Sequence, residues 1–251
     1  MRAWCKDASA VSRLDAAAAS GGEILRSTLS VSAHAGVTPA EVERAIAERI
    51  AAAGATPVTP DVFPACASIA VNAEIAHAVP STSPLQRGDL VTVDVPVCVG
   101  GWWSDQADSV VVGGGTHDLI MAARSVARAM FNRIRPGVLW SAVAESARSE
   151  AARLDVRLVA GLAGHGIGRD LHEPPVAWLE GGQDFTLLPG LCVTLEPVVT
   201  TGCGEAAVGG DGLTLVTMDG HLAAGAERAV VVTRDGARVL GRDGDFGWEP
   251  R

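Results

Sequence analysis

Two histidines stand close together in a glycine-rich run between Gly164 and His172, which reads GHGIGRDLH. Imidazole side chains bind divalent metals, and they accept or release a proton near neutral pH. The interspersed glycines have no side chain, so a substrate can approach the backbone closely. The run therefore indicates metal binding or proton transfer, with His165 and His172 as its candidate residues.

Four carboxylates lie in apolar, strand-like surroundings elsewhere in the chain, and a charge buried there is costly unless a partner compensates it. Two other interpretations stay open for single members of this set. Asp94 would also fit a buried hydrogen-bonded network, and Asp105 would also fit a polar loop. As a set, the four acids predict a bound cation: Asp94, Asp105, Glu196 and Glu227.

Asp94 and Asp105 are placed symmetrically about Val99 and Gly100. A β-hairpin that turned there would set the two side chains opposite each other on one face, with Cβ atoms about 4.5–5.5 Å apart. Like charges at that distance repel each other, and a bound cation would reverse the effect. We therefore expect the two aspartates to share a cation.

Oxygen-rich ligation with one imidazole is typical of Mn, Fe(II), Co or Zn. Two carboxylates that bridge would hold two such ions about 3.5–4 Å apart. Such a pair of ions lowers the pKa of a shared water and polarises a scissile carbonyl. The donor set therefore predicts a hydrolase with two divalent metal ions: Asp94, Asp105, His165, Glu196 and Glu227.

Composition narrows the function classes. The formal net charge of −9 argues against a nucleic-acid partner, because phosphate binding needs clustered cations. Lys6 is the chain's one lysine and there is no tyrosine, which disfavours Schiff-base and tyrosine acid–base chemistry. The five cysteines form no CxxC pair, so neither a disulfide framework nor a zinc knuckle is indicated.

The chain begins without the apolar core of a signal peptide, and no run of about 18 apolar residues follows. We therefore expect a cytoplasmic enzyme without a membrane partner.

Hydrophobic periodicity predicts helices over residues 9–30, 39–53, 116–134 and 141–155. Thr38 and Glu41 are spaced as a capping box, with Pro39 at the first helical position. Strand-like runs are predicted over residues 68–71, 90–97, 109–112, 157–160, 191–200, 213–217, 229–232 and 238–240. Two helices and several strands in each half predict an α+β fold, with antiparallel sheet and helices packed on one side. The expected domain covers residues 1–241, with halves of about 1–115 and 116–241 and a tail over 242–251.

The ordered motifs resemble those of type I methionine aminopeptidases, members of the pita-bread or creatinase-like peptidase family, from the first helix to about Leu240. Residues 68–80, SIAVNAEIAHAVP, resemble the first catalytic-histidine motif around His77. Residues 87–95, RGDLVTVDV, resemble the segment that carries the first aspartate ligand. The remaining matches are Asp105, the GHGIG run with His172, Glu196-Pro197 and Glu227.

That resemblance implies a pita-bread fold of two pseudo-symmetric halves and a role for each matched residue. Asp94 would chelate one ion, and Asp105 with Glu227 would bridge both. His165 and Glu196 would complete the second ion's ligands, and Glu196 would also pass a proton to the leaving amine. His77 and His172 would be catalytic residues that hold substrate without binding metal. The resemblance further implies a monomer that acts on the N-terminus of a peptide or nascent chain.

The expected substrate pocket departs from the family's pattern. Phe63 stands at an aromatic position and Asp61 where histidine is usual. Leu171 and Leu213 replace a phenylalanine and a tryptophan that are common there, and Ser68 completes the candidate pocket. Around Glu227 the chain reads GAERA, where the family usually has an amide and then a histidine.

We therefore expect a metalloaminopeptidase that removes N-terminal methionine. The altered pocket keeps open a paralogue acting on another small amide or peptide, in secondary metabolism or inhibitor resistance, and an X-Pro peptidase. A catalytically silent binding protein is the remaining alternative, although every ligand and catalytic histidine of the motif is in place.

Overall fold

The helices begin and end close to where the sequence predicts. Residues 4–241, the part of the chain that this computed structural model describes, contain α1 (Ala8–Ser32), α2 (Pro39–Ala52), α3 (Asp118–Arg133) and α4 (Trp140–Arg153). Before α2, the Thr38 hydroxyl accepts a hydrogen bond from the Glu41 backbone N–H, and the Glu41 carboxylate accepts one from the Thr38 N–H. This capping box fixes the start of α2, because it satisfies N–H groups that the first turn leaves without partners.

The first half of the chain forms two three-stranded antiparallel sheets, in the orders β2-β4-β7 and β1-β5-β6. The expected strand over residues 90–97 is two strands, because Pro96 has no N–H to donate to a ladder. The strands are β1 (Thr56–Pro57), β2 (Ser68–Val71), β3 (Glu74–Ala76), β4 (Leu90–Asp94), β5 (Val97–Val99), β6 (Trp102–Ser104) and β7 (Ala107–Val111).

The second half contains a five-stranded sheet in the order β10-β9-β11-β16-β17 and a smaller one in the order β15-β12-β8. The expected strand over residues 191–200 is likewise divided, here at Glu196 and Pro197. The strands are β8 (Arg157–Leu158), β9 (Ala163–Gly166), β10 (Glu173–Trp178), β11 (Cys192–Leu195), β12 (Val198–Thr200), β13 (Ala206–Val208), β14 (Leu215–Thr217), β15 (Ala223–Gly225), β16 (Arg228–Val232) and β17 (Ala237–Val239).

The hairpin between Asp94 and Asp105 turns one residue later than expected. Val99 pairs with Trp102 across Gly100 and Gly101, both of which have positive φ. Asp94 is therefore opposite Ala107 in the β4–β7 ladder rather than opposite Asp105. The prediction of directly opposed aspartates is wrong because the two glycines, which adopt positive φ without steric cost, set the turn.

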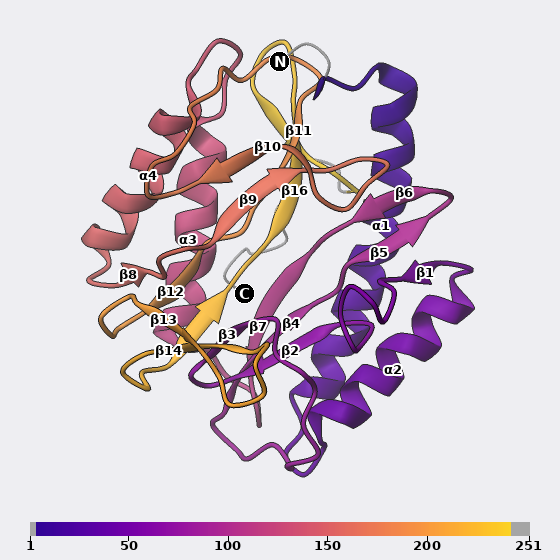
Figure 1. Ribbon diagram of the computed structural model, residues 1–251, viewed down its shortest axis with the longest axis vertical. Helices are drawn as coiled ribbons and strands as arrows, with labels where there is room; N and C mark the ends of the chain where they lie inside the picture. The colour runs from indigo at the N-terminus through magenta and orange to yellow at the C-terminus, as the bar shows by residue number, and fades with distance from the viewer. Residues whose placement is uncertain (1–3, 242–251) are drawn as a thin grey trace.

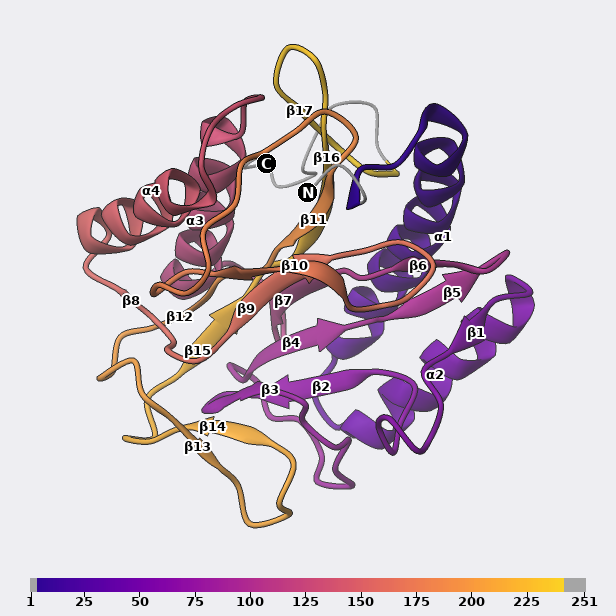
Figure 2. The same cartoon turned by 45° about the horizontal axis from the view of Figure 1, so that its top comes forward.

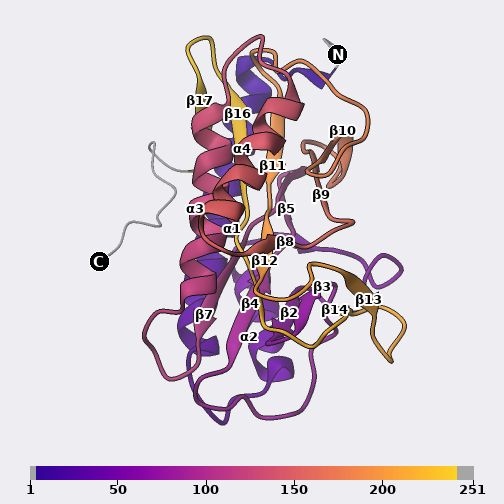
Figure 3. The same cartoon turned by 90° about the vertical axis from the view of Figure 1, so that its left-hand side faces the viewer.

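The helices lie on one side of the strands, as expected for this α+β fold. In the view of Figure 1 the α3/α4 pair is at the left of the molecule and the α1/α2 pair is at the right. Figure 3 shows β9, β10, β13 and β14 on the side away from the helices. Each helix pair has its own apolar core, with Ile46 and Val93 in the first and Met130 and Leu195 in the second.

Several contacts tie the two halves together. Leu215 of β14 pairs with Ala76 of β3, where the two segments lie side by side in Figure 2. At the centre of the molecule, the Ser109 hydroxyl donates a 2.7 Å hydrogen bond to the Gly225 carbonyl. These contacts support the single domain expected over residues 1–241, which stays a prediction, and the expected tail at 242–251 lies outside the described residues. Among the helices described between residues 4 and 241, none is both long and apolar enough to cross a membrane.

Candidate metal centre

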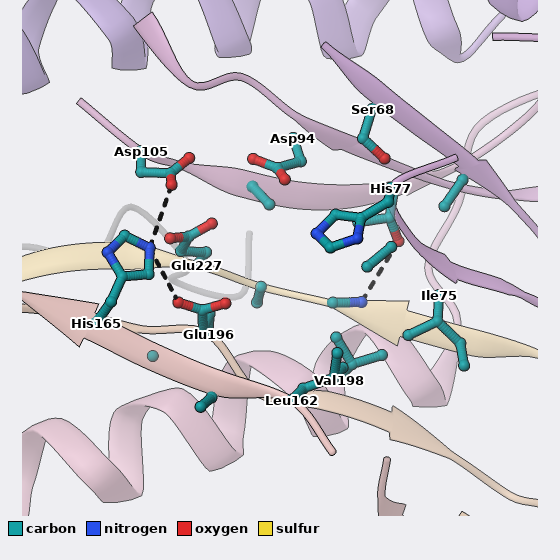
Figure 4. A pocket seen from close by; sticks show the side chains of 18 of the residues that line it. Ser68, Ile75, His77, Asp94, Asp105, Leu162, His165, Glu196, Val198 and Glu227 are labelled. Carbon is teal, nitrogen blue, oxygen red and sulfur yellow. Dashed lines mark hydrogen bonds and ion pairs between the residues drawn. The ribbon is translucent and has the colours of Figure 1, made fainter. Parts of the chain in front are cut away.

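Five candidate ligands converge from five different segments of the two halves. They come from the end of β4, the residue after β6, the middle of β9, the residue after β11 and the junction of β15 with β16. Figure 4 shows their side chains directed toward one another across the space between the halves. They are Asp94, Asp105, His165, Glu196 and Glu227.

The distances between their donor atoms suit shared cations. Donor atoms of Asp94, Asp105 and Glu227 lie within 4.8 Å of one another, and so do those of His165, Glu196 and Glu227. His165 Nε2 is 3.4 Å from Asp105 Oδ2 and 3.6 Å from Glu196 Oε1. Glu227 belongs to both groups, so one carboxylate stands between the two sets of donors.

The hydrogen bonding of three buried carboxylate oxygens shows whether the residues of the cluster fit a metal ion. Asp94 Oδ1, Asp105 Oδ1 and Glu227 Oε1 have no hydrogen-bond partner within the described residues 4–241. A buried polar atom without a partner is rare in folded proteins, because it loses its water without compensation. All three oxygens belong to the converging cluster, so the residues present fit divalent cations that prefer oxygen ligands.

The electrostatics of the cluster also favour a bound cation. Burial, with the neighbouring charges of Asp105 and Glu196, raises the pKa of Asp94 well above its usual range. Burial and the charge of Asp105 do the same to the pKa of Glu227. Burial raises the pKa of Glu196 to about 7, although His165 and Thr194 oppose the shift. Without bound metal, these carboxylates repel one another and hold protons.

His165 is oriented by its own backbone and by Thr194. Its Nδ1 lies 3.0 Å from the Gly166 carbonyl, which leaves Nε2 directed at the carboxylates. Thr194 Oγ1 accepts a hydrogen bond from the His165 N–H (2.9 Å) and donates one to Glu196 Oε1 (2.6 Å). Burial lowers the pKa of His165, but the hydrogen bond to Asp105 and the nearby carboxylate charges outweigh it and raise this pKa to about 9. A metal ion would replace the proton that these charges hold on the ring.

The close packing of β9 against β11 explains why residue 164 is a glycine. A Cβ at this position would lie 2.5 Å from the Thr194 carbonyl oxygen, far inside van der Waals contact. The glycine therefore lets β9 approach β11 closely enough for Thr194 to reach both His165 and Glu196.

The two candidate catalytic histidines border the cluster. The rings of His165 and His172 meet edge to face, with centroids 4.4 Å apart. His77 has a φ of 52°, a left-handed conformation that is uncommon outside glycine and that concentrates at functional sites. Burial and the charge of His165 lower the pKa of His172, which favours the neutral form of its ring. His172 also lies within 4.8 Å of Asp105 and His165 donor atoms, which places it within reach of a metal.

A cavity of about 250 Å³ opens beside the cluster and contains most of the expected substrate pocket. Four of the five candidate residues line it, namely Phe63, Ser68, Leu171 and Leu213. Asp61 is exposed and is not among the residues that line this cavity. His77, Asp94, Asp105 and His172 also line the cavity, so the pocket is continuous with the candidate metal centre.

Three residues of the site have no counterpart in the sequence-based expectations. Thr194 orients two candidate ligands, and Val176 and Trp178 line the cleft that contains the cluster. Thr194 precedes Glu196 by two residues in an extended segment, so the two side chains are on the same face. This spacing in the sequence could have identified Thr194. Val176 and Trp178 carried no such signal, because the fold alone brings β10 beside β9.

The fold and the cluster together define a metal-dependent hydrolase of the pita-bread type. The chain belongs to metallopeptidase family M24, whose model matches residues 12–234. It is 38% identical over 185 residues to a methionine aminopeptidase of Treponema pallidum, covering 71% of this chain and 72% of that protein. It is 31% identical over 229 residues to a methionine aminopeptidase of Clostridium perfringens, covering 87% and 92%.

The structure agrees with this assignment. The crystal structure of methionine aminopeptidase from Rickettsia prowazekii superposes with a TM-score of 0.89 at 26% identity, covering 95% of this chain and 99% of that one. The expected family, the pita-bread fold and the need for a divalent metal cofactor are therefore confirmed.

Proposed function

We propose that this protein is a metalloaminopeptidase that removes methionine from the N-terminus of peptides or nascent chains. The observation that carries the proposal is the convergence of five donors around buried carboxylate oxygens that lack partners among residues 4–241. Relatives over most of the chain are named methionine aminopeptidases, which supports the same substrate class.

The residues present divide into ligands for two divalent ions, Co, Mn, Fe or Zn. Asp94 would hold one ion, Asp105 and Glu227 would be shared between the two, and His165 with Glu196 would hold the other. When bound, such ions act as Lewis acids and make water nucleophilic near neutral pH.

The side chains around the cluster would handle protons and orient the substrate. Glu196 would accept a proton and pass it to the departing amine. Thr194 donates to Glu196 Oε1 at 2.6 Å, which fixes the direction of the carboxylate during that transfer. His77 and His172 hold the substrate carbonyl and stabilise the negative charge that develops on its oxygen.

The cavity beside the cluster would receive the side chain of the N-terminal residue. Phe63, Leu171 and Leu213 give it an apolar wall that suits methionine. We further propose that residues 1–241 form one catalytic domain, that the protein acts as a monomer, and that it works in the cytoplasm without nucleic-acid or membrane partners.

The decisive experiment measures hydrolysis of short peptides by protein reconstituted with Co or Mn. Release of methionine from Met-Ala-Ser is expected, with little release from Leu-Ala-Ser or Asp-Ala-Ser. A preference for proline-second peptides would indicate an X-Pro peptidase instead, and turnover confined to other aminoacyl amides would indicate a paralogue with another substrate. Absence of turnover with every metal and substrate would indicate a catalytically silent binding protein.

A further inference from the structure

Two apolar side chains are exposed on β10, at the edge of the five-stranded sheet. Val176 is 50% exposed and Trp178 is 40% exposed, while Ala177 and Leu179 are buried. Alternate residues of a strand face the same side, so Val176 and Trp178 form one apolar surface. Exposed large apolar groups that adjoin one another and line a cleft call for a binding explanation, unlike scattered ones.

This surface adjoins the candidate metal centre. Val176 pairs with His165 in the β9–β10 ladder, and both Val176 and Trp178 line the cleft of about 400 Å³ that contains the cluster. Leu162 and Val198, which Figure 4 labels below the ligands, line the same cleft. The apolar surface therefore begins beside the reacting groups and extends away from them.

The Trp178 segment is held in place. Its backbone carbonyl accepts a 2.7 Å hydrogen bond from Trp140 Nε1. Gly182 lies directly against the ring, because a Cβ there would approach Trp178 Cδ1 to 2.5 Å. The structure thus presents the indole at the cleft instead of leaving it to turn freely, which lowers the entropy lost when a ligand binds.

The cavity lined by Phe63, Leu171 and Leu213 and the cleft lined by Val176 and Trp178 share five residues: Ser68, His77, Asp94, Asp105 and His172. An aminopeptidase has one residue on the amino side of the scissile bond, and the cavity accounts for it. The remaining chain must then leave through the cleft. Two residues of an extended peptide span about 6.6 Å, the same as the spacing of Val176 and Trp178 along β10.

We propose that Val176 and Trp178 form an apolar shelf that binds the third and fourth residues of the substrate and favours apolar side chains there. This inference rests on the proposed aminopeptidase function. The shelf would discriminate among substrates that share the same N-terminal methionine and the same second residue.

The test uses the full chain loaded with Co and three substrates: Met-Ala-amide, Met-Ala-Leu-Leu-amide and Met-Ala-Ser-Ser-amide. Wild-type protein is expected to show a higher kcat/KM for the Leu-Leu substrate than for the Ser-Ser substrate. Trp178→Ala should lower that ratio about tenfold, equivalent to ~1.4 kcal/mol. Met-Ala-amide, which does not reach the shelf, should change less than about twofold.

Matched variants distinguish loss of the shelf from general damage to the enzyme. Val176→Ser should lower the ratio about threefold, so the shelf stays testable if Trp178→Ala does not fold. Val208→Ser, at another exposed valine on β13, should leave all three substrates unchanged. Trp178→Phe should keep most of the selectivity.

Equal loss on all three substrates, or an unchanged ratio in Trp178→Ala and Val176→Ser, would overturn the shelf while leaving the aminopeptidase function standing. Failure of wild-type protein to release methionine from any of the three would instead overturn the proposed function, and the shelf with it.

Discussion

Arg228 and Asp108 form a buried ion pair, with 3.4 Å between Nη2 and Oδ2, and it joins the segments that carry Glu227 and Asp105. Arg228 Nη1 also donates to the Ala107 carbonyl at 2.9 Å, and the Glu227 N–H donates to the same carbonyl. The arginine that departs from the family's pattern after Glu227 therefore has its partner on β7. It holds β16 against β7 where the two halves meet.

Arg228→Ala should destabilise the metal-free protein by about 3 kcal/mol, because it leaves part of a buried polar network without partners. Asp108 keeps its 2.9 Å pair with Arg124, which limits the loss. Urea unfolding followed by circular dichroism measures the change. Arg26→Ala removes an exposed helical pair with Glu23 and should cost less than ~1 kcal/mol. Equal effects of the two substitutions would contradict the role given to the buried pair.

Metal removal should lower the thermal midpoint, because ions that bind only the folded state stabilise it. At a free metal concentration of one hundred times Kd the expected gain is ~2.7 kcal/mol. Thermal scans with EDTA and with increasing Mn or Co measure it. Asp94→Asn should weaken this response yet raise the midpoint of the metal-free protein, since it relieves repulsion with Asp105 and Glu196. A metal-free Asp94→Asn protein less stable than wild type would contradict the charge argument.

Thr194→Val should lower kcat about tenfold to a hundredfold with little change in KM, because side chains that orient metal ligands commonly have effects of this size. Valine keeps the shape of threonine but cannot contact Glu196 Oε1 or the His165 N–H through a hydroxyl. Thr194→Ser keeps the hydroxyl and should retain most activity. Steady-state kinetics on a methionyl peptide distinguish the two, and equal losses in both variants would point to packing instead.

The parts of the molecule that depend on local interactions followed from the sequence. The Thr38–Glu41 capping box set the start of α2, and the spacing of apolar residues set the four helices. Acids in apolar segments marked the candidate ligands, because burying a charge without a partner is costly wherever it occurs.

What the sequence could not give depends on contacts between distant segments. The turn at Gly100 and Gly101 fixed the register of the hairpin, so Asp94 faces Ala107 while its side chain still meets that of Asp105. The surface of Val176 and Trp178 arises only when β10 joins β9. Hydrophobic periodicity and capping residues do not predict the hairpin register or the pairing of β10 with β9, because tertiary packing sets both.

His172→Ala and His165→Ala should separate a residue that holds substrate from one that binds metal. The two rings lie 4.4 Å apart beside Asp105, so proximity alone does not assign the roles. His165 Nε2 points at Asp105 and Glu196, and its loss should lower the amount of tightly bound metal and abolish activity. His172→Ala should keep the metal stoichiometry of wild type and lose about a hundredfold to a thousandfold in kcat, the usual effect of removing a donor to a developing oxyanion. Elemental analysis after dialysis, paired with peptide hydrolysis, makes the comparison, and loss of metal from His172→Ala would move that histidine into the ligand set.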